Sequence, residues 1–224
     1  MRPARRCLPP ALLSCLLLAG CSSIDLGDPT ASAGKSSPVA GAPVTAAPAG
    51  GEKAIAVGAG PQKHYTVQQQ PAAGSCHYRY EHGEPLEDRK CTPGAISPAV
   101  TQANLKSTIC RKGGYTSGVR PSAYVTGKEK RLNAASYGYT GRMADAEYDH
   151  LISLQLGGDP NDPRNLWVEP ADPGHRKGAG VNNRKDPVET KLHTAVCAGQ
   201  ITLAAAQKAI VTDWTTALTT LHLG

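Results

Sequence analysis

The clearest pattern of apolar and polar positions lies in the last third of the chain. An apolar run from Leu151 to Leu156 ends at the sequence Gly-Gly-Asp-Pro of residues 157–160, which is a strong turn signal. The chain resumes with Asn-Leu-Trp-Val at residues 165–168, which predicts a second short strand. The stretch from Ala146 to Glu169 therefore predicts a β-hairpin.

Two helices are predicted after this hairpin. Asp186 is a suitable N-cap, Pro187 suits the first helical position and Glu189 completes a capping-box pattern, so a helix is expected from there to about Gly199. A final helix is expected from about Leu203 to Leu221. It would bury one apolar face, made of Leu203, Ala206, Ile210, Trp214, Ala217 and Leu221.

The pattern is weaker before residue 145. Residues 76–92 predict a small disulfide-closed loop or hairpin, and Ser97 with Pro98 predicts a short helix through Ile109. Within residues 111–140, short extended pieces are expected at Val119, Tyr124 and Val125. Short strands mixed with helices in this way predict an α+β fold.

The first twenty residues have the pattern of a secretory signal peptide. Three arginines precede an apolar stretch from Leu8 to Gly20, which is too short to span a membrane as a helix. The sequence Leu-Ala-Gly-Cys at residues 18–21 resembles the lipobox of bacterial lipoproteins, in which the cysteine is lipidated and becomes the new N-terminus. We expect an exported protein, attached to a membrane of the cell envelope by a lipid on Cys21. An ordinary cleaved signal, which would give a secreted protein, is the alternative.

Residues 21–62 are dominated by Ala, Gly, Pro and Ser, so they predict a flexible stalk without chemistry. Order is expected to begin near Cys76, with a disulfide-pinned region at residues 75–140 and a domain at residues 141–224. The formal net charge falls from +6 to +3 when residues 1–20 leave, because they contain three arginines and no acidic residue. Such a mildly basic protein permits a polyanionic partner without requiring one.

Four of the seven cysteines remain for disulfides, because two leave with the signal peptide and Cys21 would be lipidated. In an exported protein, Cys76, Cys91, Cys110 and Cys197 predict two disulfides, and three connectivities are open. We favour Cys76–Cys91, which closes a local loop, and Cys110–Cys197, which ties the region before the hairpin to the region after it. None of the four belongs to a Cys-x-x-Cys pair, so a zinc knuckle is not expected.

An Asp-His pair, a glycine turn, an asparagine and a helix follow one another within residues 145–199. The segment Asp-His-Leu-Ile-Ser-Leu-Gln-Leu-Gly-Gly (149–158) leads to Asn-Leu-Trp (165–167) and then to Asn-x-x-Lys (182–185). This order resembles the HNH (ββα-metal) nuclease family. The resemblance implies a small hairpin-helix core that holds one divalent metal ion and hydrolyses phosphodiester bonds of nucleic acid.

The resemblance also implies a role for each matched residue. His150 would be the general base that takes a proton from the attacking water. Asp149 would give a carboxylate oxygen to a divalent cation, with Mg²⁺ expected first and Mn²⁺ as an alternative. Asn165 would fix the hairpin and orient His150. Asn182 stands at the position of the last metal ligand, whereas Lys185 and the neighbouring Arg184 would contact backbone phosphates.

The third metal ligand stays open at this point. The helix start predicted at Asp186 leaves Asn182 in a loop, while Glu189 and His193 share one helix face and are alternative ligands. His193 could equally be a packed histidine or one that supports a ligand. Glu147 would share a strand face with the aspartate ligand, either as its supporting carboxylate or as a solvated residue.

Strand geometry poses a question about Asp149 and His150. Neighbouring residues of a strand point to opposite faces, yet the implied mechanism needs both side chains near one ion. A twisted or bulged strand would bring them together.

Three interpretations of function, from different classes, follow. The first is a monomeric, metal-dependent endonuclease that cleaves DNA, or RNA, with low sequence specificity. The second is a surface lipoprotein that uses the same scaffold only to bind polyanions. The pairing of Asp149 with His150 speaks against it, because a binder needs no general base. The third is a disulfide-stapled structural domain whose resemblance to the nucleases is a coincidence.

Overall fold

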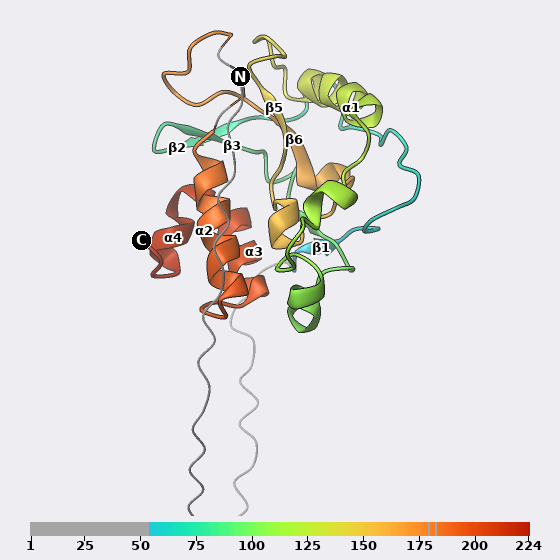
Figure 1. Cartoon of the computed structure of the whole chain (residues 1–224). Helices are drawn as coiled ribbons and strands as arrows, with labels where there is room; N and C mark the ends of the chain where they lie inside the picture. Colours follow the sequence, from blue (N-terminus) through green and yellow to red (C-terminus); the bar gives the residue numbers. More distant parts are fainter. Residues whose placement is uncertain (1–53, 179, 182) are drawn as a thin grey trace, which may run out of the picture. The chain divides into compact units, whose positions relative to one another are not determined.

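The structure of the chain, a computed structural model, describes residues 54–178, 180–181 and 183–224 (Figure 1). The predicted signal peptide, the lipidation site Cys21 and most of the predicted stalk lie outside these residues, and so does Asn182. Within the described part, no helix is long and apolar enough to cross a membrane.

Short strands and helices are mixed along the described chain, so the fold combines α and β structure, as the sequence predicts. The strands pair two by two: β1 (Ala56–Val57) with β4 (Ala95–Ile96) in parallel, and β2 (Arg79–Glu81) with β3 (Glu84–Leu86) and β5 (Glu147–His150) with β6 (Leu166–Glu169) antiparallel. The helices are α1 (Ala123–Ser136), α2 (Lys185–Cys197), α3 (Leu203–Asp213) and α4 (Ala217–Thr220). Short 3-10 helices complete the order: η1 (Gln102–Ser107), η2 (Thr116–Gly118), η3 (Leu154–Leu156), η4 (Pro163–Asn165) and η5 (Trp214–Thr216).

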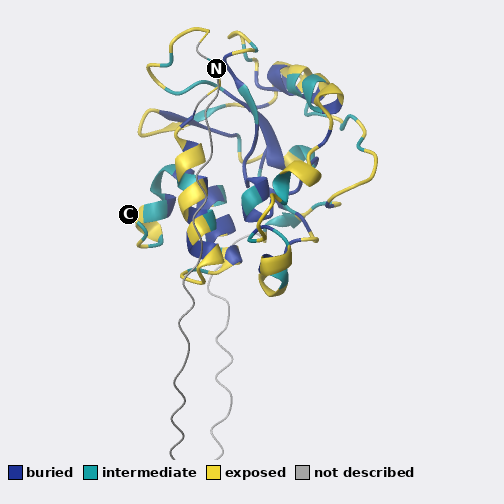
Figure 2. Ribbon diagram, viewed as in Figure 1, coloured by how far each residue is buried: buried dark blue, intermediate teal, exposed yellow. Residues whose placement is uncertain are grey.

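Strands β5 and β6 and helix α2 follow one another along the chain and surround the candidate site. In the strand pair, Asp149 lies opposite Trp167 and His150 opposite Leu166. Helix α1 contacts β6, while α2 packs against η3, α3 and α4 around the main apolar core (Figure 1). Figure 2 shows β6 as buried, and all four of its residues are.

The first strand of the hairpin is shorter than predicted. β5 ends at His150, and the apolar run that follows forms a bend and the 3-10 helix η3 instead of a strand. Leu151, Ile152 and Leu156 are completely buried in the main core. An apolar run of this length is compatible with burial in either conformation, so the pattern predicted burial correctly and conformation wrongly.

Helix α1 lies where the sequence analysis expected extended chain, and it contains Tyr124 and Val125. Its buried face includes the polar residues Glu129 and Asn133 beside Val125 and Ala134. Because polar residues occupy part of this face, the helix carries no clear apolar period.

Ordered structure begins before Cys76, which the sequence analysis expected as its start. Strand β1 falls inside the segment predicted as a stalk and pairs with β4. Further along the same segment, the Gly60 N–H donates to Oδ2 of Asp159 at 2.6 Å. These contacts join residues far apart in sequence, so composition gives no sign of them.

Helix boundaries differ from the prediction at three places. The short helix expected from Ser97 is the 3-10 helix η1, which starts later. Helix α2 begins at Lys185, and Asn183 Oδ1 accepts the Asp186 N–H at 3.1 Å, so Asp186 lies in the first turn instead of at the N-cap. The last helix is broken after Asp213, and η5 begins at Trp214. Its predicted apolar face is nevertheless buried at Leu203, Ala206, Ile210, Trp214 and Ala217.

Disulfides join Cys76 to Cys91 and Cys110 to Cys197, which confirms the favoured pairing. The first bond encloses the hairpin of β2 and β3, as expected for residues 76–92. The second fixes the end of α2 to the segment that follows η1. Such bonds point to an extracellular or otherwise oxidising environment.

Candidate functional site

A cavity of about 240 Å³ opens at the end of β5, beside the first turns of α2. Its wall includes one arginine, one histidine and four carboxyl groups: Arg120, His150, Glu147, Asp149, Asp186 and Glu189. A second cavity, of about 480 Å³, shares Arg120, Glu147 and His150 with the first and is also lined by the first turns of α1. The two cavities therefore meet at His150.

Asp149 and His150 both line the first cavity, although they are neighbours on one strand. The pairing of β5 with β6 is regular from Glu147 to His150, so no bulge brings them together. His150 is the last residue of β5, and the chain bends after it. Asp149 and His150 therefore reach the same cavity at the end of the strand, without a bulge.

The imidazole of His150 is buried and tied to a backbone carbonyl. Its Nε2 lies 3.1 Å from the Pro160 oxygen. A carbonyl only accepts, so Nε2 carries a proton, and Nδ1 of the neutral ring keeps a free lone pair. Burial lowers the pKa of His150 to about 4; Asp149 opposes this shift, whereas Arg120 and Lys185 add to it. At neutral pH the ring is therefore uncharged and able to accept a proton, as a general base must be.

Asn165 holds the loop that presents the Pro160 carbonyl. Its Nδ2 donates to the carbonyl oxygens of Ile152 at 3.0 Å and Asp159 at 3.1 Å, and its Oδ1 accepts the Ile152 N–H at 3.0 Å. The side chain is completely buried. Because Asp159 precedes Pro160, these bonds fix the loop whose Pro160 carbonyl accepts from His150.

A glycine pair makes this close packing possible. Gly157 has a φ of 74°, in the left-handed region that favours glycine. A Cβ on Gly158 would lie 1.7 Å from the Ile152 carbonyl oxygen and 2.8 Å from Nδ2 of Asn165. A larger residue at 158 would therefore displace the asparagine.

Lys185 lies among the carboxyl groups and is almost completely buried. Its Nζ donates to Asp149 Oδ2 at 2.6 Å, to the backbone oxygen of His150 at 2.9 Å and to Glu189 Oε1, so each N–H of the ammonium has an acceptor. Burial lowers the pKa of Lys185, but Asp149, Glu189 and Glu169 outweigh it and hold the pKa well above its ordinary value. The lysine is charged and enclosed, which corrects the phosphate-contacting role predicted for it.

The family resemblance implies a divalent ion at Asp149, and the residues around this aspartate show whether such an ion fits. Carboxylate oxygens around the cavity are ligands of the type that Mg²⁺ prefers. Three ligand atoms from Asp, Glu, His or Cys side chains within 4.8 Å of one another could hold an ion. Among the described residues, such a group is found at Cys110, His193 and Cys197, and none is found around Asp149. Lys185 also engages one oxygen of Asp149 and one of Glu189. As they stand, these residues do not fit an ion at Asp149.

Other carboxyl groups of the site hold protons more readily than exposed ones. Burial raises the pKa of Glu147 to about 7, and Asp149 and Asp186 add to the effect. Burial, with Asp149 beside it, also raises the pKa of Glu169 well above its ordinary value. Near neutral pH the negative charge of the site is therefore smaller than the number of acidic residues indicates.

Asn183, just before α2, is a site residue that the sequence analysis missed. Its Nδ2 donates to Glu147 Oε2 at 3.0 Å and to Glu169 Oε2 at 3.4 Å. Glu147 is thus held by an asparagine and is not simply solvated. Asn182, the predicted last ligand, lies outside the described residues. Two adjacent asparagines carry the same signal, so the motif alone does not distinguish them.

Two arginines near the site differ in their partners, because within the described residues one forms an ion pair and the other does not. Arg184, predicted to contact phosphate, forms an ion pair with Glu84, with 2.6 Å between Nη1 and Oε1. Arg120 is exposed and lines both cavities, and none of the ion pairs and hydrogen bonds of the described residues involves it. Arg120 was not predicted from the sequence, because it comes to line the same cavities as His150 only when the chain folds.

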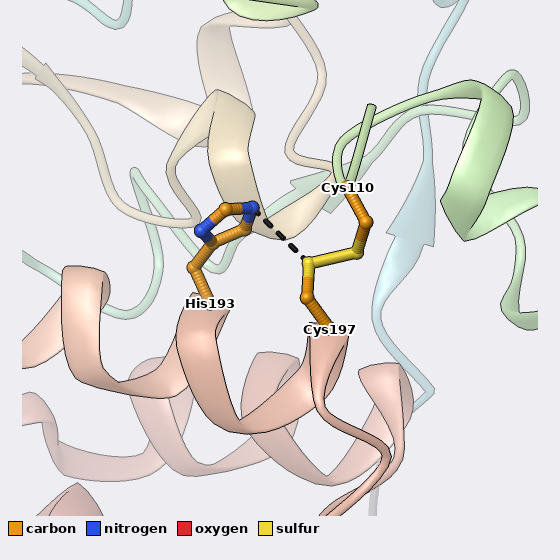
Figure 3. A group of neighbouring side chains, drawn as sticks. All are labelled: Cys110, His193 and Cys197. Atoms are coloured by element: carbon orange, nitrogen blue, oxygen red, sulfur yellow. Dashed lines mark hydrogen bonds between the residues drawn. A yellow bond between two sulfur atoms is a disulfide. The ribbon is translucent and has the colours of Figure 1, made fainter. Parts of the chain in front are cut away.

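His193 lies beside the Cys110–Cys197 disulfide and does not line the cavity (Figure 3). Its Nε2 is 2.9 Å from the Ile109 oxygen and 3.3 Å from Cys197 Sγ. The ligand atoms of Cys110, His193 and Cys197 lie within 4.8 Å of one another, a spacing that suits a metal ion. Because the two sulfurs are bonded to each other, thiolate ligands exist there only after reduction. His193 is thus not placed to act as a ligand beside Asp149.

Comparison with models of known protein families, with curated proteins and with solved structures finds no match to this chain. The resemblance to HNH nucleases therefore stays a prediction that rests on the motif. What the structure establishes is coarser: a mixed α and β fold with two disulfides and a polar cavity beside a buried histidine.

Proposed function

We propose that this chain is an endonuclease of the ββα type, exported and lipid-anchored, which hydrolyses phosphodiester bonds of DNA or RNA. The main support for the proposal is the state of His150. Its imidazole is buried and neutral, and its Nε2 donates to the Pro160 carbonyl. Its remaining nitrogen is a free base at a polar cavity. A site that only binds polyanions has no need of such a base.

In the proposed reaction, Nδ1 of His150 takes a proton from a water molecule as the water oxygen bonds to phosphorus. The bridging P–O bond breaks, and the departing oxygen takes a proton from solvent. Arg120 binds the non-bridging oxygens, because its guanidinium is exposed beside His150 and matches a phosphate in shape and charge. Pro160 keeps the imidazole oriented throughout.

The second cavity supports low sequence specificity. Its wall includes the start of α1, where unpaired backbone N–H groups and the helix dipole favour an anion. Together with Arg120, this wall offers contacts to a sugar-phosphate backbone beside His150. Backbone contacts position a nucleic acid without reading its bases.

A divalent ion, Mg²⁺ or Mn²⁺, is part of the sequence-based prediction. When bound, such an ion would supply positive charge to the phosphate. Because the groups around Asp149 do not fit it as they stand, no step of the proposed reaction passes through an ion.

The test is cleavage of supercoiled plasmid and of single-stranded RNA by the purified protein, with His150→Ala and the exposed His64→Ala as a matched pair. We expect wild type and His64→Ala to cleave, and His150→Ala to be slower by roughly a hundredfold or more. Retention of nucleic acid without cleavage would favour the second candidate, a lipoprotein that binds polyanions. Equal cleavage by all three proteins would remove His150 from the reaction.

A further inference from the structure

A lysine occupies the space between two side chains that the sequence analysis offered as metal ligands. Asp149 on β5 and Glu189 on α2 each give a carboxylate oxygen to Nζ of Lys185. The third acceptor is the backbone oxygen of His150. The ammonium thus links the last two residues of β5 to α2.

Asp149 and Glu189 need a positive partner because both carboxyl groups are buried. Lys185 is 1% exposed, and Asp149 and Glu189 are 7% and 3% exposed. Carboxylates so far removed from water need a cation or a proton as partner. Lys185 and Glu189 are four residues apart on one helix, so α2 brings its own cation to the carboxylate of β5.

Lys185 also performs the structural task of an ion in a hairpin-helix core. It fixes the carboxylate just before His150 and the carbonyl of His150 itself relative to α2. A divalent ion that bridged Asp149 and Glu189 would have to displace this ammonium, because two of its three donors already engage one oxygen of each carboxylate.

We propose that Lys185 takes the place of the metal ion at Asp149 and acts as a positioning residue for Asp149, His150 and Glu189. The site then hydrolyses phosphodiesters without a divalent ion at Asp149. The activity part of this inference rests on the proposed nuclease function, whereas its binding part does not.

The first experiment uses wild-type protein and the variant Asp149→Asn. Mn²⁺ binding is measured by electron paramagnetic resonance, and plasmid cleavage is measured with Mg²⁺ and with EDTA. We expect no Mn²⁺ site that depends on Asp149, and equal cleavage in Mg²⁺ and in EDTA. A Mn²⁺ site that is present in wild type and lost in Asp149→Asn would overturn the proposal, and so would complete inhibition by EDTA.

The second experiment empties the position with Lys185→Ala, beside Lys191→Ala on the exposed face of α2 as the control. Two buried carboxylates without their ammonium form a cation site, so Lys185→Ala should bind Mn²⁺ roughly tenfold or more tightly than wild type. Mn²⁺ should also raise its melting temperature, and cleavage should become sensitive to EDTA. Adding Asp149→Asn should abolish these gains. A folded Lys185→Ala protein that gains no Mn²⁺ affinity contradicts the proposal.

The outcomes separate this inference from the proposed function. If Lys185→Ala does not fold, the wild-type measurements of Mn²⁺ binding and EDTA resistance decide alone. If wild type cleaves no nucleic acid, with or without Mn²⁺, the nuclease proposal fails. The Mn²⁺ affinities of wild type and Lys185→Ala still decide whether the lysine stands in for the ion.

Discussion

Asn133 on α1 accepts the backbone N–H of Val168 on β6, with 2.7 Å between Oδ1 and N. The side chain is 1% exposed, and its Nδ2 donates to Gln70 Oε1 at 2.9 Å. A helix side chain thus satisfies the outer edge of a two-stranded sheet, in the place where a third strand would otherwise pair. Because the start of α1 also lines the second cavity, this bond fixes one wall of the site relative to the strand that faces β5.

Replacing Asn133 with Ala should destabilise the protein measurably. The change leaves the buried Val168 N–H without its acceptor, at a cost of about 2 kcal/mol in the free energy of unfolding. The measurement is urea denaturation followed by circular dichroism, with Leu132→Ala as the control, because Leu132 is half exposed on the same helix. A smaller loss in Asn133→Ala than in Leu132→Ala would show that the edge of β6 does not depend on this amide.

The pH dependence of cleavage should report the lowered pKa of His150. A general base fails when it is protonated, so the rate falls as pH decreases through the pKa. Burial sets that pKa at about 4, so kcat/KM should keep its value from pH 7 down to about pH 5 and fall below that. Initial rates between pH 4 and pH 8 give the profile. A fall centred near pH 6.5, the ordinary value for histidine, would show that the ring is not held in its neutral form.

The parts of the fold that the sequence predicted are those fixed by local chemistry. The turn at Gly157 and Gly158 was predicted from its motif, and in the structure one backbone angle and one close approach require the two glycines. An even number of remaining cysteines predicted two disulfides, and the pairing Cys110–Cys197 was favoured because it joins the regions before and after the hairpin. The buried face of α3 followed from its apolar period.

The parts that were missed depend on partners distant in sequence. Helix α1 was missed because Glu129 and Asn133 are buried through hydrogen bonds to other segments, which breaks the apolar period. Lys185 was predicted to contact phosphate, because nothing local shows that its ammonium donates to Asp149 in the folded chain. The spacing of Lys185 and Glu189, four residues apart, was nevertheless a usable signal of an ion pair on one helix face.

Substitution of Arg120 tests its proposed contact with the scissile phosphate. Arg120→Ala removes an exposed guanidinium from both cavities, and we expect kcat/KM for plasmid cleavage to fall roughly a hundredfold. Arg120→Lys should recover part of the loss, because it restores the charge without the planar geometry. Arg131→Ala, on the exposed surface of α1, is the matched control and should cleave like wild type. Equal rates for the two alanine variants would exclude Arg120 from contact with the scissile phosphate.

Glu87 should make the folded state less stable as pH rises. Its side chain is 1% exposed, and burial raises its pKa from 4.5 to about 7, although Arg79 lies 3.0 Å away and opposes the shift. Between these two values the folded protein binds a proton that the unfolded chain has released. Unfolding therefore becomes easier as pH rises through this window, and the change approaches about 3 kcal/mol above pH 7.

The variant Glu87→Gln tests this contribution, because glutamine has a similar shape and no proton to release. Wild type should lose stability between pH 5 and pH 8 relative to Glu87→Gln, as measured by urea denaturation at both values with the disulfides intact. Glu81→Gln, at an exposed position of the neighbouring strand β2, should follow wild type at both pH values. A stability difference between wild type and Glu87→Gln that stays constant with pH would mean that Arg79 keeps the buried carboxylate charged throughout, so that the ion pair outweighs the cost of burial.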